Sequence, residues 1–336
     1  MKAVCVTEAR ALELREVPAP TEAELPPDHV LVEMEASAIN HGDKTFLARP
    51  ATTSGLNTSR HNIWGASGAG RVLAVGADLP KDLTGRKVAI YRSLTPSRHT
   101  VGLWSERAVV PFTSCVVLPD QAAIPDYSGS LVNAITAYAF LEDTAAEGHK
   151  GVVVTAGSSA SGLALAALVQ ARKTPAIFLV RSAESRESMR SLGIEHVVAT
   201  SDRDFDTEFE GLAEELRTTA VFDGVGGDLI TRIAPLLPVN SSVSFYGFLA
   251  GAAPISVPTG LFMSKNLVMR RFSNFNSATV READRLREAL RNLQGRIGDP
   301  LFHTRIGATF RLDQVQEAMA YETTPGQKAV LVMKPE

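Results

Sequence analysis

Cysteine is scarce in this sequence, whose 336 residues include only Cys5 and Cys115. Two cysteines can build neither a disulfide framework nor a four-cysteine zinc lobe. A strong charge of either sign is also missing, because a formal net charge of -3 gives no broad attraction to nucleic acid or to an anionic membrane. No stretch approaches the roughly 18 apolar residues of a transmembrane helix, and the opening MKAVCVTEAR has no apolar run before a cleavage site. These absences predict a cytoplasmic protein without nucleic-acid or membrane partners.

The composition that is present is typical of a globular protein with a sizeable core, since 45% of the residues are hydrophobic and 21% are charged. The length suits two domains or one large one. Up to about Leu118, short alternating segments such as His29 to Ala38 are punctuated by glycine and proline, which predicts a β-rich, barrel-like domain. Beyond Pro119, apolar strands alternate with helices until roughly residue 265, where the pattern changes again. This alternation predicts an α/β fold with a doubly wound parallel sheet.

The stretch from Gly151 to Arg186 has the pattern of a βαβ unit. Val152 to Val154 and Ala176 to Val180 are typical of strands buried on both faces, and Leu163 to Ala171 is an apolar helix between them. The turn before this helix can bring backbone N–H groups close to a pyrophosphate; its residues are Gly157, Ser158, Ser159, Ala160, Ser161 and Gly162. Only its two glycines match the dinucleotide-binding pattern, so an ordinary strand–turn–helix is the alternative interpretation.

The second strand of this unit ends in Arg181 and Ser182, with Arg186 close behind. A site for NAD would place Asp or Glu near this point, to accept hydrogen bonds from the ribose hydroxyls. Guanidinium groups suit a 2′-phosphate instead. The predicted cofactor is therefore NADPH.

Taken together, these segments resemble the medium-chain dehydrogenase/reductase superfamily, in its zinc-independent quinone oxidoreductase and enoyl reductase branch. The resemblance covers nearly the whole chain and depends on the order of its matching segments, which are MKAVCVTEAR, Ala38 to Asp43, Gly65 to Val72, Thr136 to Tyr138, the turn at Gly157, Phe222 to Gly227, Tyr246-Gly247 and Gly326 to Val330. It implies a Rossmann domain at residues 125–265, inserted into a β-rich GroES-like catalytic domain at residues 1–124 and 266–336. It also implies a homodimer, in which the strands near Ser242 to Tyr246 of two subunits pair.

The departures from the family pattern indicate which chemistry is missing. Zinc-dependent relatives place Cys where Asn40 stands and a His-Glu pair where Ala66-Ser67 stand. Catalytic zinc needs three protein ligands and an open position, and no other His/Cys grouping in the sequence has metal spacing. We therefore expect no metal site, and a reaction in which NADPH delivers a hydride to a small molecule that is already electrophilic.

Asn40 and Asp43 are the candidate catalytic residues, because they match the Asn and Asp that follow this strand in the family. Asn40 could donate to the substrate oxygen or contact the nicotinamide, and Asp43 could orient the turn; the alternative is that both residues only cap the turn. Enoyl thioester reductases of this branch place a tyrosine shortly afterwards, whereas residues 46–50 here contain none. The proton could come from water, with His61 and Tyr91 as stand-ins for the tyrosine.

Further cofactor contacts follow from the resemblance. They are Thr136 beside the nicotinamide and phosphate, the turn Asp223, Gly224 and Val225, the strand end Tyr246 and Gly247, the returning segment with Phe272 and Asn274, and the basic residue Lys328. Each has a simpler interpretation: Thr136 could cap its helix, residues 223–227 could be a plain turn, and Lys328 could be an exposed lysine. Trp64, Trp104 and Phe248 are interpreted as packing residues.

The resulting hypothesis is an NADPH-dependent, zinc-independent oxidoreductase that transfers a hydride to a quinone or an α,β-unsaturated carbonyl compound. One alternative is an enoyl thioester reductase. The other is an NADPH-binding protein without turnover, as in the crystallin-like and RNA-binding members of this branch. Residues 50–62 are the expected determinant of the acceptor.

Overall fold

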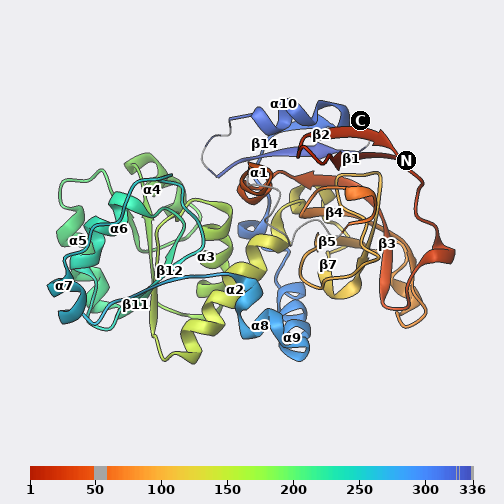
Figure 1. Cartoon of the computed structure of the whole chain (residues 1–336). Helices are drawn as coiled ribbons and strands as arrows, with labels where there is room; N and C mark the ends of the chain where they lie inside the picture. Colours follow the sequence, from red (N-terminus) through yellow and green to blue (C-terminus); the bar gives the residue numbers. More distant parts are fainter. Residues whose placement is uncertain (49–58, 323, 325, 334–336) are drawn as a thin grey trace. The chain divides into compact units, whose positions relative to one another are not determined.

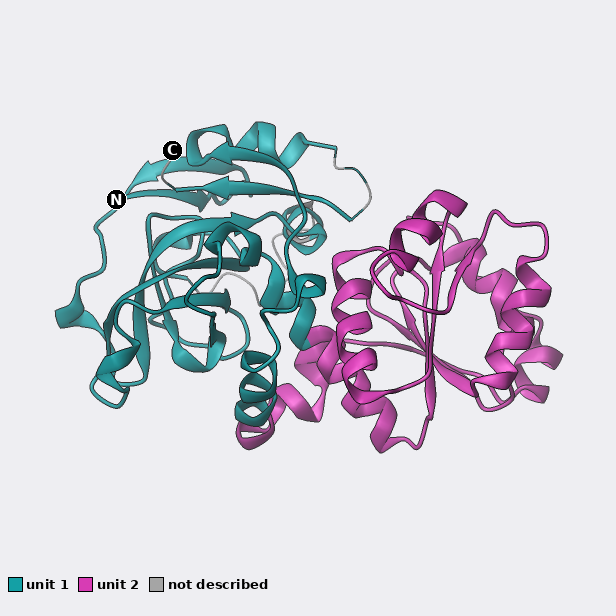
Figure 2. Cartoon of the chain, turned by 180° about the vertical axis from the view of Figure 1, so that it is seen from behind, with its two compact units in different colours: residues 1–135, 286–336 teal, residues 136–285 magenta. Residues whose placement is uncertain are grey.

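The computed structural model describes residues 1–48, 59–322, 324 and 326–333, so most of the loop expected to select the acceptor lies outside the described residues. Contacts divide the chain into two compact units: unit 1 contains residues 1–135 and 286–336, and unit 2 contains residues 136–285 (Figure 2). Among the described residues, no helix combines the length and apolar character needed to cross a bilayer.

Unit 1 is built around the long strand β3 (His29–Ala38) (Figure 1). Its other strands are β1 (Lys2–Val6), β2 (Leu12–Glu16), β4 (Ser67–Val75), β5 (Lys87–Tyr91), β6 (Arg107–Pro111), β7 (Cys115–Val117), β14 (Ile306–Arg311) and β15 (Lys328–Val332). β1 and β2 form a hairpin, and the larger sheet has the order β14-β15-β3-β4-β5-β7, with β6 also paired to β3. The helices α1 (His41–Ala48), α9 (Ala283–Gln294) and α10 (Val315–Ala320) accompany these strands.

The predicted strand from His29 to Ala38 is confirmed, and its pairing positions the candidate catalytic residues. Val30, Val32 and Met34 of β3 enter the core of unit 1, which explains their alternation with polar residues. β15 runs antiparallel to β3, with Val330 opposite Ala38. The first residue of β15, Lys328, therefore lies beside the segment that follows β3, where Asn40 stands.

Unit 2 has the predicted fold class, a doubly wound parallel sheet. Its strands are β8 (Gly151–Val154), β9 (Ala176–Val180), β10 (Val197–Ala199), β11 (Thr218–Asp223), β12 (Ser242–Phe245) and β13 (Val268–Arg271), all parallel, in the order β10-β9-β8-β11-β12-β13. Helices lie on both sides of this sheet (Figure 2). They include α2 (Ser130–Ala146), α3 (Ala160–Arg172), α4 (Ala183–Arg190), α5 (Phe205–Glu215), α6 (Gly227–Ile233), α7 (Thr259–Ser264) and α8 (Ala278–Arg281).

Strand β13 is the main difference from the sequence-based expectation. Its four residues, VMRR, are mostly exposed and are not the continuous apolar run that indicates a buried strand. Because β13 pairs with β12, the sheet continues past residue 265, where the inserted domain was expected to end. β12 is also hydrogen-bonded on its other side, by β11, and offers no free edge for the expected pairing of strands near Ser242 to Tyr246. The edge strand next to β12 is β13, and β10 forms the opposite edge of the sheet.

The three aromatic residues interpreted as packing have different environments. Trp64 and Trp104 are buried in the core of unit 1, as predicted. Phe248 leaves 48% of its surface exposed, so the packing interpretation is wrong for this residue. Phe248 lies in the irregular segment after β12.

Candidate functional site

The turn between β8 and α3 is closed by its own backbone and by Ser159. The Ser159 hydroxyl accepts a hydrogen bond from the Gly162 N–H at 3.1 Å and so caps the N-terminus of α3. A Cβ atom at Gly162 would lie 2.3 Å from the carbonyl oxygen of Gly157, so only glycine allows the backbone to approach this closely. Ser158, Ala160 and Ser161 are partly exposed around the start of the helix. The turn therefore presents a helix N-terminus, where an anion is favoured.

Asp223, at the end of β11, is fully buried and uses its carboxylate within the neighbouring turn. Its Oδ1 accepts from the Thr155 hydroxyl at 2.5 Å and from the Val225 N–H at 3.2 Å, and its Oδ2 accepts from the Gly226 N–H at 2.8 Å. Burial raises the pKa of Asp223, and these hydrogen bonds oppose that shift. Asp223 thus shapes the turn that follows β11. The partner Thr155 was not found from the sequence, because a single threonine after a strand carries no motif.

Tyr246 connects the turn that follows β11 to the turn between β8 and α3. Its ring stacks on Phe222, with centroids 3.9 Å apart, and its hydroxyl group is hydrogen-bonded to Ser159 and Ser161. Burial raises the pKa of Tyr246 to about 12. A Cβ atom at Gly224 would lie 2.6 Å from the Tyr246 hydroxyl oxygen. Residues from the ends of β8, β11 and β12 therefore meet at the carboxyl edge of the sheet, where ligands of open α/β sheets bind.

Four further residues expected around the cofactor lie in unit 2 in different settings. Phe272 is buried, with its ring centroid 5.8 Å from that of Phe140. Asn274 is buried, and its side-chain nitrogen has no hydrogen-bond partner among the described residues, so it could still receive a ligand acceptor. Thr136 lies well inside α2, so the alternative that it caps this helix is wrong. Gly247 follows Tyr246 and donates its N–H to the Asp223 carbonyl at 3.3 Å.

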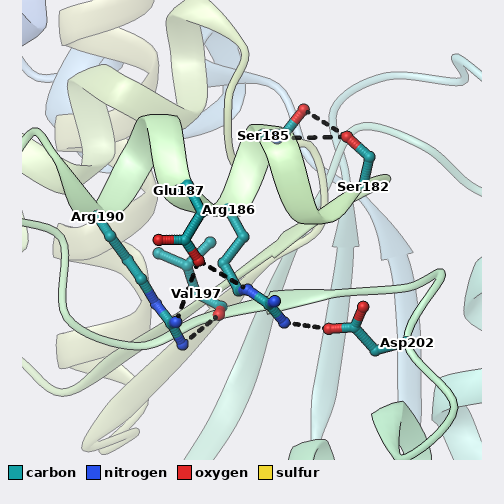
Figure 3. Close-up of polar contacts among 7 residues, drawn as sticks. All are labelled: Ser182, Ser185, Arg186, Glu187, Arg190, Val197 and Asp202. Carbon is teal, nitrogen blue, oxygen red and sulfur yellow. Dashed lines mark hydrogen bonds and ion pairs between the residues drawn. The ribbon is translucent and has the colours of Figure 1, made fainter.

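The arginines predicted to hold a 2′-phosphate differ in their availability. Arg181, directly after β9, is exposed and forms no side-chain hydrogen bond or ion pair within the described part of the chain. Ser182 caps α4 by accepting from the Ser185 N–H at 3.3 Å. Arg186 forms an ion pair with Asp202 and a second one with Glu187 at 3.4 Å (Figure 3). Among the described residues Arg181 therefore has no charged partner, whereas Arg186 is already paired.

Asn40 is the centre of a polar network in unit 1. Its side-chain nitrogen lies 2.8 Å from Ser67 Oγ and 3.1 Å from Asp43 Oδ2, and its side-chain oxygen accepts from Lys328. Asp43 Oδ2 also accepts from the Asn40 N–H at 2.9 Å, across the first turn of α1. The turn-capping contact that was the alternative for Asn40 and Asp43 is thus present. The alternative for Lys328 is wrong, because its ammonium group is bonded and its side chain is half-buried.

The charges of this network perturb one another. Burial raises the pKa of Asp43, although hydrogen bonds from Asn40 and the cations Arg92 and Lys328 oppose this. Burial lowers the pKa of Lys328 to about 8 and that of Arg92 to about 10, and Asp43 limits both shifts. Arg92 donates to the Ile63 carbonyl at 3.0 Å. Ser67 and Arg92 were not expected as members of this site, since their contacts with the segment after β3 depend on strand pairing.

Comparisons with known proteins agree with this architecture. A family model described as the alcohol dehydrogenase GroES-like domain matches residues 26–120. The synaptic vesicle membrane protein VAT-1 homolog of Homo sapiens is 26% identical over 185 residues, which cover 54% of this chain and 45% of that protein. Prostaglandin reductase-3 of Bos taurus is 27% identical over 251 residues, which cover 73% of this chain and 60% of that protein. The chain spans less than two thirds of the length of either relative.

Solved structures extend the likeness to the whole chain. A quinone oxidoreductase of Pseudomonas syringae aligns with a TM-score of 0.73 and 20% identity, covering 99% of each chain. A mycobacterial protein in complex with NADPH aligns with a TM-score of 0.72 and 22% identity, covering 99% of this chain and 100% of that one. At these identities the likeness establishes the shared fold alone. Residues 26–120 therefore form an alcohol dehydrogenase GroES-like domain, and the chain as a whole has the fold of these reductases, with a parallel-sheet unit following that domain.

Proposed function

We propose that the protein is an NADPH-dependent oxidoreductase that reduces a quinone or an α,β-unsaturated carbonyl compound. The observation that carries the proposal is the free guanidinium of Arg181 beside Ser182, at the same sheet edge as the turn containing Gly157 and Gly162. Arg181 stands where an acidic residue would bind the ribose of NAD. The turn suits a pyrophosphate, because its glycines let the start of α3 lie close against the turn and the helix N-terminus favours an anion.

NADPH would supply the hydride when bound, and the chain would supply binding and orientation. We propose that the turn at residues 157–162 holds the pyrophosphate, that Arg181 and Ser182 hold the 2′-phosphate, and that Arg186 joins them when the phosphate competes with Asp202. Val225, Tyr246, Gly247 and Asn274 would border the nicotinamide half.

The side chains around Asn40 do not suit zinc, so we derive no step through a metal. Asn40 and Ser67 offer neutral oxygen atoms, Ala66 offers none, and the ammonium group of Lys328 is bonded directly to Asn40. A divalent cation would be repelled by this ammonium, and zinc prefers Cys, His and carboxylate ligands. We therefore place the protein in the zinc-independent branch. An electrophilic acceptor suits this site, because it accepts a hydride without a metal to polarise its oxygen.

The names of the relatives support the same acceptor class. A quinone oxidoreductase and an NADPH complex are among the proteins with this fold, and a prostaglandin reductase is among the sequence relatives. An enoyl thioester reductase is the nearest alternative, and an enoyl-[acyl-carrier-protein] reductase of Xenopus tropicalis is 26% identical over 252 residues. A panel of quinones, enones and enoyl thioesters, followed by the loss of NADPH absorbance, tests the assignment. NADPH binding without turnover on every acceptor would contradict it and favour a binding protein.

Replacing Arg181 with Ala is expected to weaken NADPH binding by roughly 10–100-fold and to leave NADH binding nearly unchanged. The reason is the loss of charge-assisted hydrogen bonds to the 2′-phosphate, worth about 1.5–3 kcal/mol. Dissociation constants from the fluorescence of the reduced cofactors provide the measurement. Arg190→Ala is the matched control, because Arg190, at the end of the following helix α4, is a cation that donates to the Val197 carbonyl instead (Figure 3). Equal losses for both cofactors in Arg181→Ala would contradict the 2′-phosphate assignment.

We also propose that a second copy of the chain is a partner, and that it docks on the edge of the sheet formed by β13. Val268 of this strand is 47% exposed, and Met263 of the preceding helix α7 is 74% exposed, so an apolar surface accompanies the edge. Two copies of the same edge strand can pair symmetrically.

Met263→Glu is expected to convert a dimer into a monomer, because it places a charge against an apolar surface. Light scattering during size-exclusion chromatography measures the change. Leu192→Glu, at an exposed apolar residue next to α4, is the control that should remain a dimer. A wild-type chain that runs as a monomer would refute this interface.

A further inference from the structure

An aspartate, a histidine and a serine of unit 1 are hydrogen-bonded in a row, at the opposite end of β3 from Asn40. His29 Nδ1 lies 2.7 Å from Asp28 Oδ1, and His29 Nε2 lies 2.7 Å from Ser97 Oγ. The row was not predicted from the sequence, because 68 residues separate His29 from Ser97 and only the folded sheet brings them together. An acid, an imidazole and a hydroxyl group in this order form the constellation that activates a serine as a nucleophile.

His29 is held firmly at the start of β3. Its backbone N–H donates to the Pro26 carbonyl at 3.1 Å, and its own carbonyl accepts from the Gly76 N–H at 2.8 Å. On the other side, β6 places Pro111 opposite His29. The side chain of His29 is only 5% exposed. Because the ring is buried and both of its nitrogens have partners, the imidazole keeps one orientation toward Ser97.

The carboxylate of Asp28 determines which nitrogen of His29 carries the hydrogen. A carboxylate only accepts hydrogen bonds, so in the neutral imidazole the hydrogen lies on Nδ1 and is donated to Asp28. Nε2 then accepts the hydroxyl hydrogen of Ser97. The opposite tautomer would place the lone pair of Nδ1 against the carboxylate oxygen. His29 is thus arranged as a base toward Ser97.

The hydroxyl group of Ser97 keeps one lone pair for an electrophile. A hydroxyl group has one hydrogen and two lone pairs. The hydrogen goes to His29 Nε2, and one lone pair accepts from the His99 N–H at 3.1 Å, while the oxygen has no further partner among the described residues. Ser97 is partly exposed, and its neighbours Pro96 and Arg98 are exposed. An electrophile can therefore reach this oxygen from solvent without a deep pocket.

Hydrogen-bond donors adjoin Ser97 in the same loop. The backbone N–H groups of Ser97 and Arg98 make no hydrogen bond within the part of the chain that the structure describes. The exposed guanidinium of Arg98 donates to His99 Nε2 at 3.1 Å and forms no ion pair there. Donors of these two kinds stabilise the negative oxygen that develops when a serine attacks a carbonyl group.

We propose that unit 1 has a second activity, the hydrolysis of small carboxylic esters. Ser97 is the nucleophile, His29 the general base and Asp28 the positioning residue. Ser97 Oγ attacks the carbonyl carbon of the ester, its proton moves to His29 Nε2, and the π electrons of the carbonyl group move to the carbonyl oxygen. These electrons then return, the bond from carbon to the alcohol oxygen breaks, and His29 gives its proton to that oxygen.

Water completes the reaction by removing the acyl group from Ser97. It attacks the acyl carbon and gives a proton to His29. The bond between this carbon and Ser97 Oγ then breaks, and Oγ takes the proton back from His29. The products are the alcohol and the carboxylic acid. No cofactor takes part, so this activity does not depend on the proposed reduction.

The test follows the hydrolysis of p-nitrophenyl acetate, without NADPH, by wild-type protein and variants. Ser97→Ala and His29→Gln are expected to lower kcat by about 100-fold or more. Asp28→Asn is expected to lower kcat by about fivefold with KM nearly unchanged, because the Asp28 side chain is 66% exposed and water takes part of its place. Ser93→Ala is the matched control and should keep the wild-type rate, because this partly exposed serine of the same loop has no hydrogen bond to a histidine within the described residues.

A second measurement does not require turnover. A fluorophosphonate forms a P–O bond with an activated serine oxygen and releases fluoride, and peptide mass spectrometry locates the label. The label is expected on Ser97 in the wild-type protein and in Ser93→Ala, and on neither serine in His29→Gln, which lacks the base. Circular dichroism checks that each variant is folded.

The failing outcomes are specific to this proposal. A wild-type protein that hydrolyses the ester no faster than Ser97→Ala, or that carries the label on another residue, overturns the assignment of Ser97. Labelling of Ser97 at the wild-type rate in folded His29→Gln overturns the role of His29. A protein that hydrolyses the ester through Ser97 but oxidises NADPH with no acceptor supports this inference and contradicts the proposed function.

Discussion

Gly162→Ala is expected to lower the affinity for NADPH by about tenfold or more, equivalent to about 1.4 kcal/mol, and to destabilise unit 2. The new methyl group would lie 2.3 Å from the carbonyl oxygen of Gly157 and 2.5 Å from that of Ala156. Both contacts are with backbone atoms, so they cannot be relieved by the rotation of a side chain. The start of α3 must therefore move away from the turn. Forcing an extra methyl group into a packed site typically costs about 1–3 kcal/mol. Cofactor fluorescence and denaturant unfolding measure the two effects.

Gly211→Ala is the matched control for this substitution. Gly211 lies inside α5, and nothing stands within 4 Å of the position its Cβ would take. Alanine in an open helical position is favoured over glycine by up to about 1 kcal/mol. This variant should therefore be as stable as wild type or more stable, with unchanged NADPH affinity. Two variants with the same stability and affinity would contradict the close approach of α3 to its turn.

Asp223→Ala is expected to reduce the free energy of unfolding by about 3 kcal/mol and to abolish tight NADPH binding. The substitution removes the acceptor of the Val225 and Gly226 N–H groups and of the Thr155 hydroxyl. Buried donors left without a partner cost about 1–3 kcal/mol each, and the turn that borders the cofactor loses its internal support. Asp223→Asn should show a smaller loss, because its remaining oxygen still accepts while its NH2 group opposes one of the donors.

The control for Asp223 is Asp228→Asn, which removes a negative charge from the exposed first turn of α6. Its effect on unfolding should stay within about 0.5 kcal/mol, as for most surface substitutions. If Asp228→Asn weakened NADPH binding as much as Asp223→Ala does, the loss of affinity would come from the change of charge near the cofactor and not from the geometry of the turn. Urea unfolding and cofactor titration of the same samples decide between these explanations.

Several elements of the candidate site were predictable because their signal is local. The apolar run before Gly157, the capping serine and the helix after it lie within about one βαβ unit, so periodicity and turn chemistry indicate them directly. The predicted positions of Arg181 and Ser182 at a strand end hold for the same reason. Strand β13 escaped prediction, since an exposed edge strand such as VMRR has neither alternation nor an apolar run.

Partnerships between distant residues were not predictable in this way. Arg186 was expected to be a free phosphate ligand, whereas the structure pairs it with Asp202, a residue beyond the next strand (Figure 3). Asn40 was a candidate either to donate to a substrate oxygen or to contact the nicotinamide, whereas in the structure its amide is hydrogen-bonded to Ser67, Asp43 and Lys328. In each case strand pairing or the path of a loop places the partner residue near the side chain. The local sequence does not indicate which residue this partner is.

The sequence by itself determined the fold class, the parallel sheet of unit 2 and the glycine-containing turn before α3, because hydrophobic periodicity and glycine conformation act over a few residues. Only the tertiary structure decided that Lys328 lies against Asn40, that Arg186 is ion-paired while Arg181 has no ion pair with the described residues, and that β13 forms one edge of the sheet. These properties depend on which side chains form hydrogen bonds with one another and are buried together. They arise when segments far apart in the chain are packed together.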